Sequence, residues 1–280
     1  EINLYRDAFY LVTVTYEDTI FTSQVKMPEP GSMDLELPVT VYEFTDDDSV
    51  IEIDLMLTRV SSYGDNLLFE QIVNFYNTSD YAYRDIQQVD QTRFESVRLA
   101  LPHGATILNQ AELMSRFVQT VTDGKLYLVD TLPVVPDSNH TVYIAYVLPF
   151  NGGQGPITVE FPIGYSLTNQ LELMLQPGRF LITSDQLNSN GVQQFTSGTY
   201  DSYLGSPLSS GETLAYTIEL SPEAAAIDAT ASQQTDDDKE ESEDTQPFAL
   251  LLLTSGIGLL TVSGGLWMLG RRVRNSSERS

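Results

Sequence analysis

Two imidazoles are all that this chain offers for histidine chemistry, His103 and His140. A Ser-His-Asp triad needs a histidine that a carboxylate orients toward a nucleophilic serine. His103 lies in a Pro-His-Gly turn, His140 follows Asn139 at the predicted start of a strand, and the sequence contains no Gly-x-Ser-x-Gly elbow. We therefore predict that both histidines are polar surface residues, that the chain has no catalytic residue, and that it is not an enzyme.

Cysteine and the metal ligands set a second limit. The chain has 280 residues and no cysteine, which excludes disulfides, thiolate zinc sites, iron–sulfur clusters and thiol catalysis. The two histidines are not spaced as a ligand pair, which argues against zinc. We expect no cofactor.

Acidic side chains dominate the composition, with 39 Asp and Glu against 14 Lys and Arg and a net charge of −25. Such a surface repels phosphate, so nucleic acid is excluded as a partner. A run between two strand patterns, Asp46-Asp47-Asp48, offers carboxylates to calcium, which takes about six to eight oxygens. Because the run lacks the Asp-x-Asp-x-Asp-Gly spacing, we expect a solvated turn. A calcium site completed by Asp65 or Asp80 is the alternative.

Carboxylates and tyrosines also raise the question of sugar chemistry. Paired carboxylates hydrolyse glycosides when one is the acid and the other the nucleophile, but among 39 acidic residues some pair reaches a suitable separation by chance. Exposed aromatic rings can bind sugars, and four tyrosines lie in polar, loop-like contexts: Tyr81, Tyr83, Tyr200 and Tyr203. They form either a tyrosine-lined ligand face or ordinary strand positions with one ring face buried.

Two segments fit the N-glycosylation sequon, Asn77-Thr78-Ser79 and Asn139-His140-Thr141. They matter only if the source glycosylates exported proteins, and otherwise they are plain turns.

The charge is unevenly distributed along the chain. Residues 1–220 carry −20, residues 221–247 carry −8, and residues 271–280 carry +3. Between the last two regions, residues 248–270 contain no charged side chain. As a helix this segment is roughly 35 Å long, enough to cross a hydrocarbon core of about 30 Å. We therefore predict a transmembrane helix over 248–270, preceded by an acidic disordered stalk over 221–247.

The orientation of the predicted span follows from the arginines that adjoin it, Arg271, Arg272 and Arg274. The positive-inside rule places the basic tail, residues 271–280, in the cytoplasm and the N-terminal domain outside the cell membrane. The chain starts at Glu1 and shows no signal peptide, so we expect a processed or trimmed N-terminus. A tail-anchored protein with a cytosolic domain is the alternative.

Small residues share one face of the predicted span: Thr254, Gly258, Thr261 and Gly265. Their spacing of four, three and four residues suits close helix packing. This pattern indicates a membrane-helix partner or self-association, although glycine is common in membrane helices in any case.

Residues 1–220 read as successive strands, because apolar residues recur with period two. The clearest runs cover residues 51–57, 67–75, 97–101, 142–146, 157–161, 171–175 and 214–220. Turn residues separate the runs. Many short strands with turns at this spacing predict an all-β antiparallel β-sandwich of Ig-like type over residues 31–220, with a closed barrel as the alternative.

Helix is expected in few places. Asn109 to Val118 carries a capping pattern and is predicted to form one or two turns, and Ser221-Pro222-Glu223 is predicted to start a helix. Residues 1–30 are predicted to form a β-hairpin from strands near 9–16 and 19–26. A lone hairpin is marginal in water, so it either packs on the main domain or is the remnant of an Ig-like domain that has lost its N-terminal portion.

The hairpin over Tyr10–Tyr16 and Ile20–Val25 resembles the last strands of a carboxypeptidase-regulatory-like domain, which is transthyretin-type and Ig-like. Further segments resemble exported, single-pass, membrane-anchored surface proteins of bacteria, notably Chloroflexota: Leu37–Asp46, Leu101–Ala105, Asp130–Pro136 and Tyr146–Phe150. These motifs are short and structural, and the group carries no established activity. The resemblance therefore implies fold and location, and no functional residues.

These patterns together predict a non-catalytic protein at the cell surface with a binding or structural role. Its partners are expected to be the membrane and an unidentified extracellular ligand, either protein or glycan. Two alternatives remain open: a carboxylate-based, glycosidase-like extracellular hydrolase, and a calcium-stiffened adhesin or surface-layer component.

Overall fold

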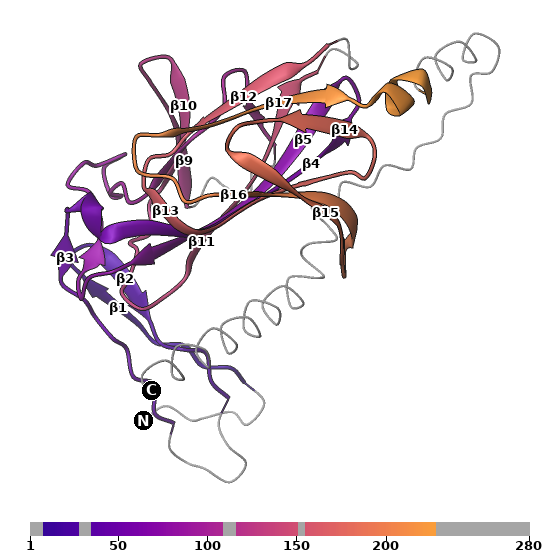
Figure 1. The fold of residues 1–280 in the computed structure, drawn as a ribbon. Coiled ribbons are helices and arrows are strands. Elements are labelled where there is room, and N and C mark those ends of the chain that lie inside the picture. Colours follow the sequence, from indigo (N-terminus) through magenta and orange to yellow (C-terminus); the bar gives the residue numbers. More distant parts are fainter. Residues whose placement is uncertain (1–7, 28–34, 109–115, 151–154, 228–280) are drawn as a thin grey trace, which may run out of the picture. The chain divides into compact units, whose positions relative to one another are not determined.

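The computed structural model describes residues 8–27, 35–108, 116–150 and 155–227, and these residues are all-β apart from short helical turns (Figure 1). All of them belong to one compact unit, residues 1–229. The strands are β1 (Thr13–Tyr16), β2 (Thr19–Thr22), β3 (Phe44–Thr45), β4 (Ile51–Tyr63), β5 (Asn66–Asn77), β6 (Ala82–Tyr83), β7 (Arg98–Ala100), β8 (Thr106–Ile107), β9 (Phe117–Thr122), β10 (Lys125–Asp130), β11 (His140–Pro149), β12 (Ile157–Pro162), β13 (Ser166–Leu175), β14 (Phe180–Thr183), β15 (Leu187–Phe195), β16 (Gly198–Gly205) and β17 (Thr213–Leu220). A 3-10 turn, η1 (Asp48–Val50), precedes β4.

The main sheet has seven strands in the order β15-β16-β13-β4-β5-β11-β8. Its centre is the hairpin of β4 and β5, whose tight connection includes Gly64 at a φ of 57°, a conformation that glycine adopts without strain. Neighbouring strands are antiparallel, except that β13 pairs in parallel with β4. The antiparallel prediction therefore holds for all but one pair of this sheet.

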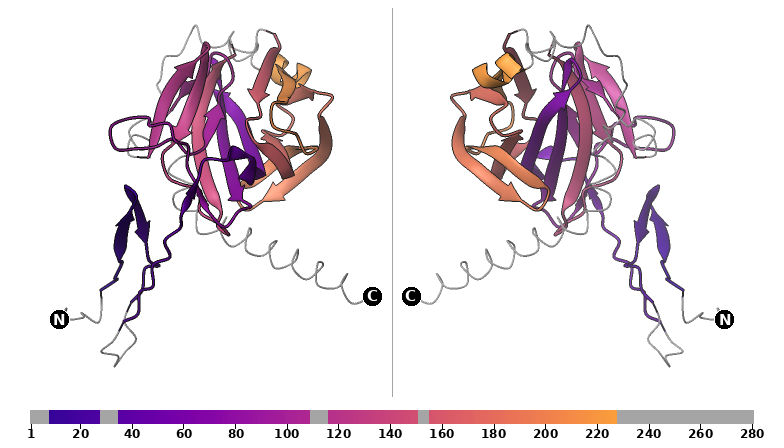
Figure 2. Two further views of the ribbon diagram at one scale, coloured as in Figure 1. Left: turned by 90° about the vertical axis from the view of Figure 1, so that its left-hand side faces the viewer. Right: turned by 90° about the vertical axis from the view of Figure 1, so that its right-hand side faces the viewer.

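One face of the seven-stranded sheet is covered by two three-stranded sheets, β7-β10-β9 and β12-β17-β14 (Figure 2). Alternate residues of the long strands, such as Met56 and Val60 of β4 and Phe69 of β5, point into the space between the layers and are fully buried. Leu128 of β10 and Ile218 of β17 reach the same core from the covering sheets. This arrangement confirms the sandwich-like, two-layer character predicted from period two.

The β1–β2 hairpin is confirmed near its predicted position. Its strands join through a turn in which Glu17 and Asp18 both have positive φ, as a type I′ turn requires. Phe21 is buried against the rings of Tyr42 and Phe44, with ring centroids 6.2 and 6.0 Å apart. The hairpin therefore packs on the segment that leads into the sandwich.

Arg84 forms the second attachment of the hairpin. Its guanidinium lies between two aromatic rings, 3.8 Å from the centroid of Phe44 and 4.3 Å from that of Phe94. The same group donates to the backbone oxygen of Glu17 at 2.6 Å and to Oγ1 of Thr19 at 3.0 Å. Cation–π contacts of this kind are worth about 0.5–2 kcal/mol.

The two helix predictions have different outcomes. Residues 222–227 are helical, and Ser221 Oγ accepts a hydrogen bond from the N–H of Ala224 at 3.1 Å, so the predicted start at Ser221 is confirmed. The prediction over Asn109 to Val118 is wrong at its end, because Phe117 and Val118 begin strand β9 and pair with β10. Residues 109–115 lie outside the described ranges.

The disordered stalk predicted over 221–247 is wrong at its start, because residues 222–227 are helical. The rest of the stalk, the transmembrane helix over 248–270 and the basic tail over 271–280 lie outside the described ranges. Within those ranges, no helix has the length and apolarity needed to cross a membrane.

Gly205 of β16 offers a direct test of how tightly neighbouring strands of the main sheet pack. A Cβ at this position would lie 2.2 Å from Cδ2 and 2.7 Å from Cγ of Leu171, which is buried on β13. Gly205→Ala should therefore destabilise the fold by about 1–3 kcal/mol through overpacking, measured by urea unfolding. Gly164→Ala is the control, because its Cβ meets nothing closer than 3.9 Å. Equal stability of the two variants would contradict this packing.

Candidate functional site

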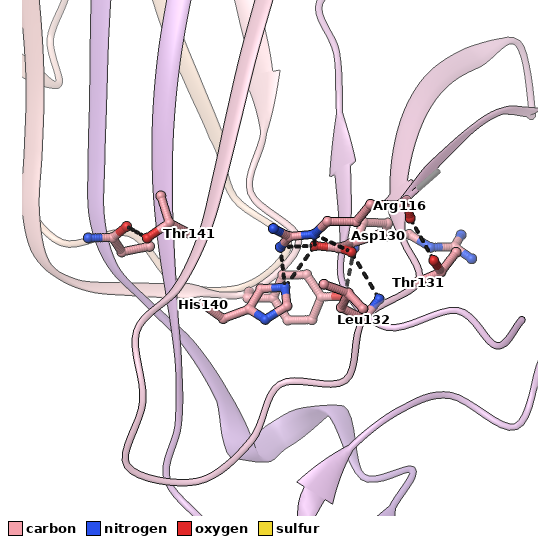
Figure 3. A network of polar contacts seen from close by, with 9 residues as sticks. Arg116, Asp130, Thr131, Leu132, His140 and Thr141 are labelled. Atoms are coloured by element: carbon pink, nitrogen blue, oxygen red, sulfur yellow. Dashed lines mark hydrogen bonds and ion pairs between the residues drawn. The ribbon is translucent and has the colours of Figure 1, made fainter. Parts of the chain in front are cut away.

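A buried polar cluster joins three strand ends and is called the clasp (Figure 3): Arg116, Asp130 and His140. Asp130 ends β10, His140 begins β11, and Arg116 directly precedes β9. Arg116 Nε donates to both carboxylate oxygens of Asp130 at 2.9 Å, and Nη2 contacts Oδ2 as well. His140 Nε2 lies 2.7 Å from the same Oδ2, and the N–H of Leu132 donates to Oδ1 at 3.0 Å.

Burial and hydrogen bonding act on Asp130 in opposite directions. Only 1% of the residue is exposed, and this desolvation on its own would raise the pKa of the carboxyl group. Hydrogen bonds and charge from His140 and Arg116 outweigh it and hold the pKa below its ordinary value. Asp130 is therefore an ionised carboxylate near neutral pH, and the proton of the Asp130–His140 contact belongs to Nε2 because a carboxylate only accepts.

The clasp has two of the three groups that a catalytic triad needs, and the hydroxyls beside it are used elsewhere. Thr131 Oγ1 donates to the backbone oxygen of Arg116 at 2.6 Å, and Thr141 Oγ1 donates to Oδ1 of Asn74 at 2.8 Å. A triad histidine uses one ring nitrogen for the carboxylate and the other for the nucleophile, whereas the contacts of His140 to Asp130 and to Arg116, at 2.7 and 2.9 Å, are both made by Nε2. The geometry is that of a structural connection between the covering sheet and the main sheet.

One of the two histidine predictions is wrong. His103 is exposed in its turn, as predicted. His140 is instead buried, because it occupies the same face of β11 as Val142 and Ile144, and it packs edge-on against Phe75. The sequence contained the missed signal: extending the alternation of residues 142–146 back by two places reaches His140, and the alternation of Leu126 and Leu128 reaches Asp130.

Three further buried acids are each held by a neighbouring group. Glu70 of β5 pairs with Arg59 of the adjacent strand, and Glu95 pairs with Arg98, whose Nη2 lies 2.6 Å from Oε2. Glu172 of β13 accepts from Ser202 Oγ at 2.8 Å and from Gln170 Nε2 at 3.0 Å. Each carboxylate is thus bound to donors, the state that makes burial of a charge tolerable.

The aspartates proposed for calcium lie on the surface. Asp46, Asp47 and Asp48 are exposed, and Asp47 caps η1 by accepting from the N–H of Ser49 at 3.0 Å and from its Oγ at 2.6 Å. These bonds lower the pKa of Asp47 below its ordinary value. In the ranges that the structure covers, no three acidic or histidine side chains gather closely enough to hold a metal ion.

The four tyrosines considered for a ligand face differ in burial. Tyr83 is buried, and desolvation raises the pKa of its hydroxyl. Tyr200 is buried on β16, where its hydroxyl accepts from Arg59 Nη1 at 3.2 Å. Tyr81 is exposed, and Tyr203 is partly buried against the core. The interpretation as ordinary strand positions describes Tyr83 and Tyr200.

The two sequons differ in access. Asn77 is 1% exposed, and its Nδ2 donates to the backbone oxygens of Tyr81 and Val134 at 2.7 Å each. Its Oδ1 accepts from the N–H of Ser79. The amide nitrogen that glycosylation would use is therefore engaged in the fold, whereas Asn139 is exposed.

Among the described residues, exposed apolar side chains gather on and beside the β1–β2 hairpin. We call it the hairpin strip, and its members are Phe9, Leu11, Ile20, Val25 and Met27. The backbone of Tyr10 bonds to that of Lys26 in both directions, so Phe9 lies opposite Met27 and Leu11 opposite Val25. Phe9 is 70% and Ile20 65% exposed. Exposed apolar side chains that lie together, as those beside the Tyr10–Lys26 pair do, mark interaction surfaces.

The residues predicted for helix packing and for topology fall outside the described ranges: Thr254, Gly258, Thr261, Gly265, Arg271, Arg272 and Arg274.

A scan against protein-family models and a search of curated proteins found no match to the chain.

Asp130→Asn should separate the clasp from an ordinary surface ion pair. The substitution keeps the shape and leaves Arg116 facing a neutral amide, so we expect a loss of about 3 kcal/mol in the free energy of unfolding at pH 7. Because the folded-state pKa of Asp130 is lowered, its contribution is present above the ordinary carboxyl pKa and is lost as pH falls through the folded value. The gap between wild type and variant should therefore narrow below about pH 4 in urea titrations.

Asp46→Asn, at an exposed position, is the matched control for Asp130→Asn. It should leave the free energy of unfolding unchanged both at pH 7 and below about pH 4. A variant of Asp130 as stable as this control would show that the clasp contributes nothing to the fold.

Calcium should leave the melting temperature unchanged. A site saturated at about 100 times its Kd would stabilise the folded state by about 2.7 kcal/mol and raise the melting temperature by several degrees. Because Asp47 is used as a cap and lies in no ligand cluster, calcium and chelator should give the same melting curve, with Asp47→Ala equally insensitive. A rise that chelator reverses would restore the calcium-stiffened alternative.

Proposed function

We propose that the chain is a single-pass membrane protein whose β-sandwich stands outside the cell membrane on an acidic stalk and acts by binding or as a structural element rather than by catalysis. In this proposal the sandwich is Ig-like, as the resemblance to carboxypeptidase-regulatory-like proteins implies. The extracellular ligand is a protein or a glycan.

The membrane location rests on the order of charges near the C-terminus. An uncharged segment, 248–270, separates a stalk of −8 from a tail of +3. A segment of that length and apolarity suits a bilayer, and the arginines that follow it favour the cytoplasmic side.

The binding role rests on one observation, the hairpin strip. Folding buries the apolar faces of the long strands in one core, yet it leaves Phe9, Ile20 and Val25 largely exposed. The buried acids, in contrast, are engaged by donors that hold strands together. The ionisable groups that could take part in catalysis are thus engaged in structural contacts, while apolar surface remains available to a partner.

Cysteine labelling tests the topology without background, because the chain has no native cysteine. Asn139→Cys places a thiol on an exposed loop of the sandwich, and Ser276→Cys places one in the tail. With a membrane-impermeant maleimide we expect intact cells to label Asn139→Cys only, and permeabilised cells to label both.

The unmodified chain is the blank for this experiment, and both variants should sediment with the membrane fraction. Labelling of Ser276→Cys but not Asn139→Cys in intact cells would support the tail-anchored alternative. Recovery of the chain without membrane would overturn the anchor.

A further inference from the structure

Strand β15 is an open edge of the main sheet. It pairs with β16 on one side, and no strand of the described residues pairs with its other side. With nine residues it is much longer than β8, which closes the opposite end of the sheet with two. An unpaired edge presents backbone N–H and C=O groups that can bind another strand, and proteins usually block such edges with charges, proline or shortness.

The edge of β15 has few of these protections. Residues 186–200 contain no charged residue and no proline, and only Asp185 and Asp201 adjoin them. Val192 is 62% and Phe195 40% exposed. One protection is present, a bulge at Ser189–Gly191, where Gln193 Nε2 donates to the backbone oxygen of Asn190 at 2.8 Å. The half that follows, Val192–Phe195, pairs regularly with β16 and is free of the bulge.

The charge of the molecule favours a particular partner for this edge. Residues 1–220 carry −20, so two copies repel each other over most of their surfaces. At the uncharged β15 edge two copies can approach without placing acids opposite acids. Pairing through the backbone needs no sequence complementarity, and a twofold axis makes the same strand serve both partners.

We propose that β15 is a homotypic docking edge, at which two copies of this chain pair Val192–Phe195 in antiparallel fashion and continue the main sheet across the dimer. The surface is separate from the hairpin strip, and the inference does not depend on the proposed function. Because the bodies repel, association should strengthen with salt, opposite to the behaviour of an ion-paired interface.

The test is the mass of the full chain in density-matched detergent, measured by sedimentation equilibrium at about 50 and 500 mM NaCl. The double variant Val192→Asp/Gln194→Asp places like charges across the new strand pair, and we expect the dimer Kd to rise on the order of tenfold. The matched control is Gln119→Asp/Val121→Asp, which adds the same charge at exposed positions of β9, another edge strand. It should dimerise as the wild type does.

A third variant separates this edge from the predicted membrane helix. Gly258→Leu/Gly265→Leu should leave the dimer intact if β15 carries it. The proposal is overturned if the wild type is monomeric at both salt concentrations, if the β15 and β9 variants behave alike, or if only the glycine variant dissociates.

Discussion

Contact between one face of the seven-stranded sheet and the two three-stranded sheets is the interaction on which the rest of the structure depends. The chain has no disulfide, and its first 220 residues carry −20, so electrostatic repulsion opposes the compact state. Apolar burial must overcome that repulsion. Each large side chain that is fully buried contributes about 1.5–3 kcal/mol, and the core joins residues such as Phe69, Tyr146 and Ile218 from both layers.

This constraint explains where the buried charges lie. A buried carboxylate is tolerable only when donors surround it, and three of the four described here, all but Glu95, bond to a neighbouring strand or strand end. Asp130 connects β10 to the start of β11 through His140, and Glu70 connects β5 to β4 through Arg59. A site with an aspartate, a histidine and an arginine in contact therefore reads as a connection between layers, since the hydroxyls nearby are directed to other acceptors.

Period two was sufficient to predict the strands and the layered, all-β class, because alternation is a local consequence of the pleat. The same alternation, extended by two residues, also predicts that Asp130 and His140 face the core. The prediction that His140 lies on the surface came from its polarity alone. Other features depend on contacts distant in sequence. The parallel pairing of β13 with β4 and the stacking of Arg84 between Phe44 and Phe94 have no local signature. Phe117 and Val118 follow a helix-capping pattern in the sequence, yet pairing with β10 makes them a strand.

The described chain consists of a tightly held sandwich and an exposed hairpin attached through Arg84 and Phe21. Amide hydrogen exchange of the full chain tests that division most directly. It predicts that amides in the middle of β4, β5 and β11 exchange only through global unfolding, whereas those of β1 and β2 exchange through local opening at a much smaller free energy. Equal protection of the hairpin and the central strands would contradict it, because the hairpin strip would then be part of a covered core.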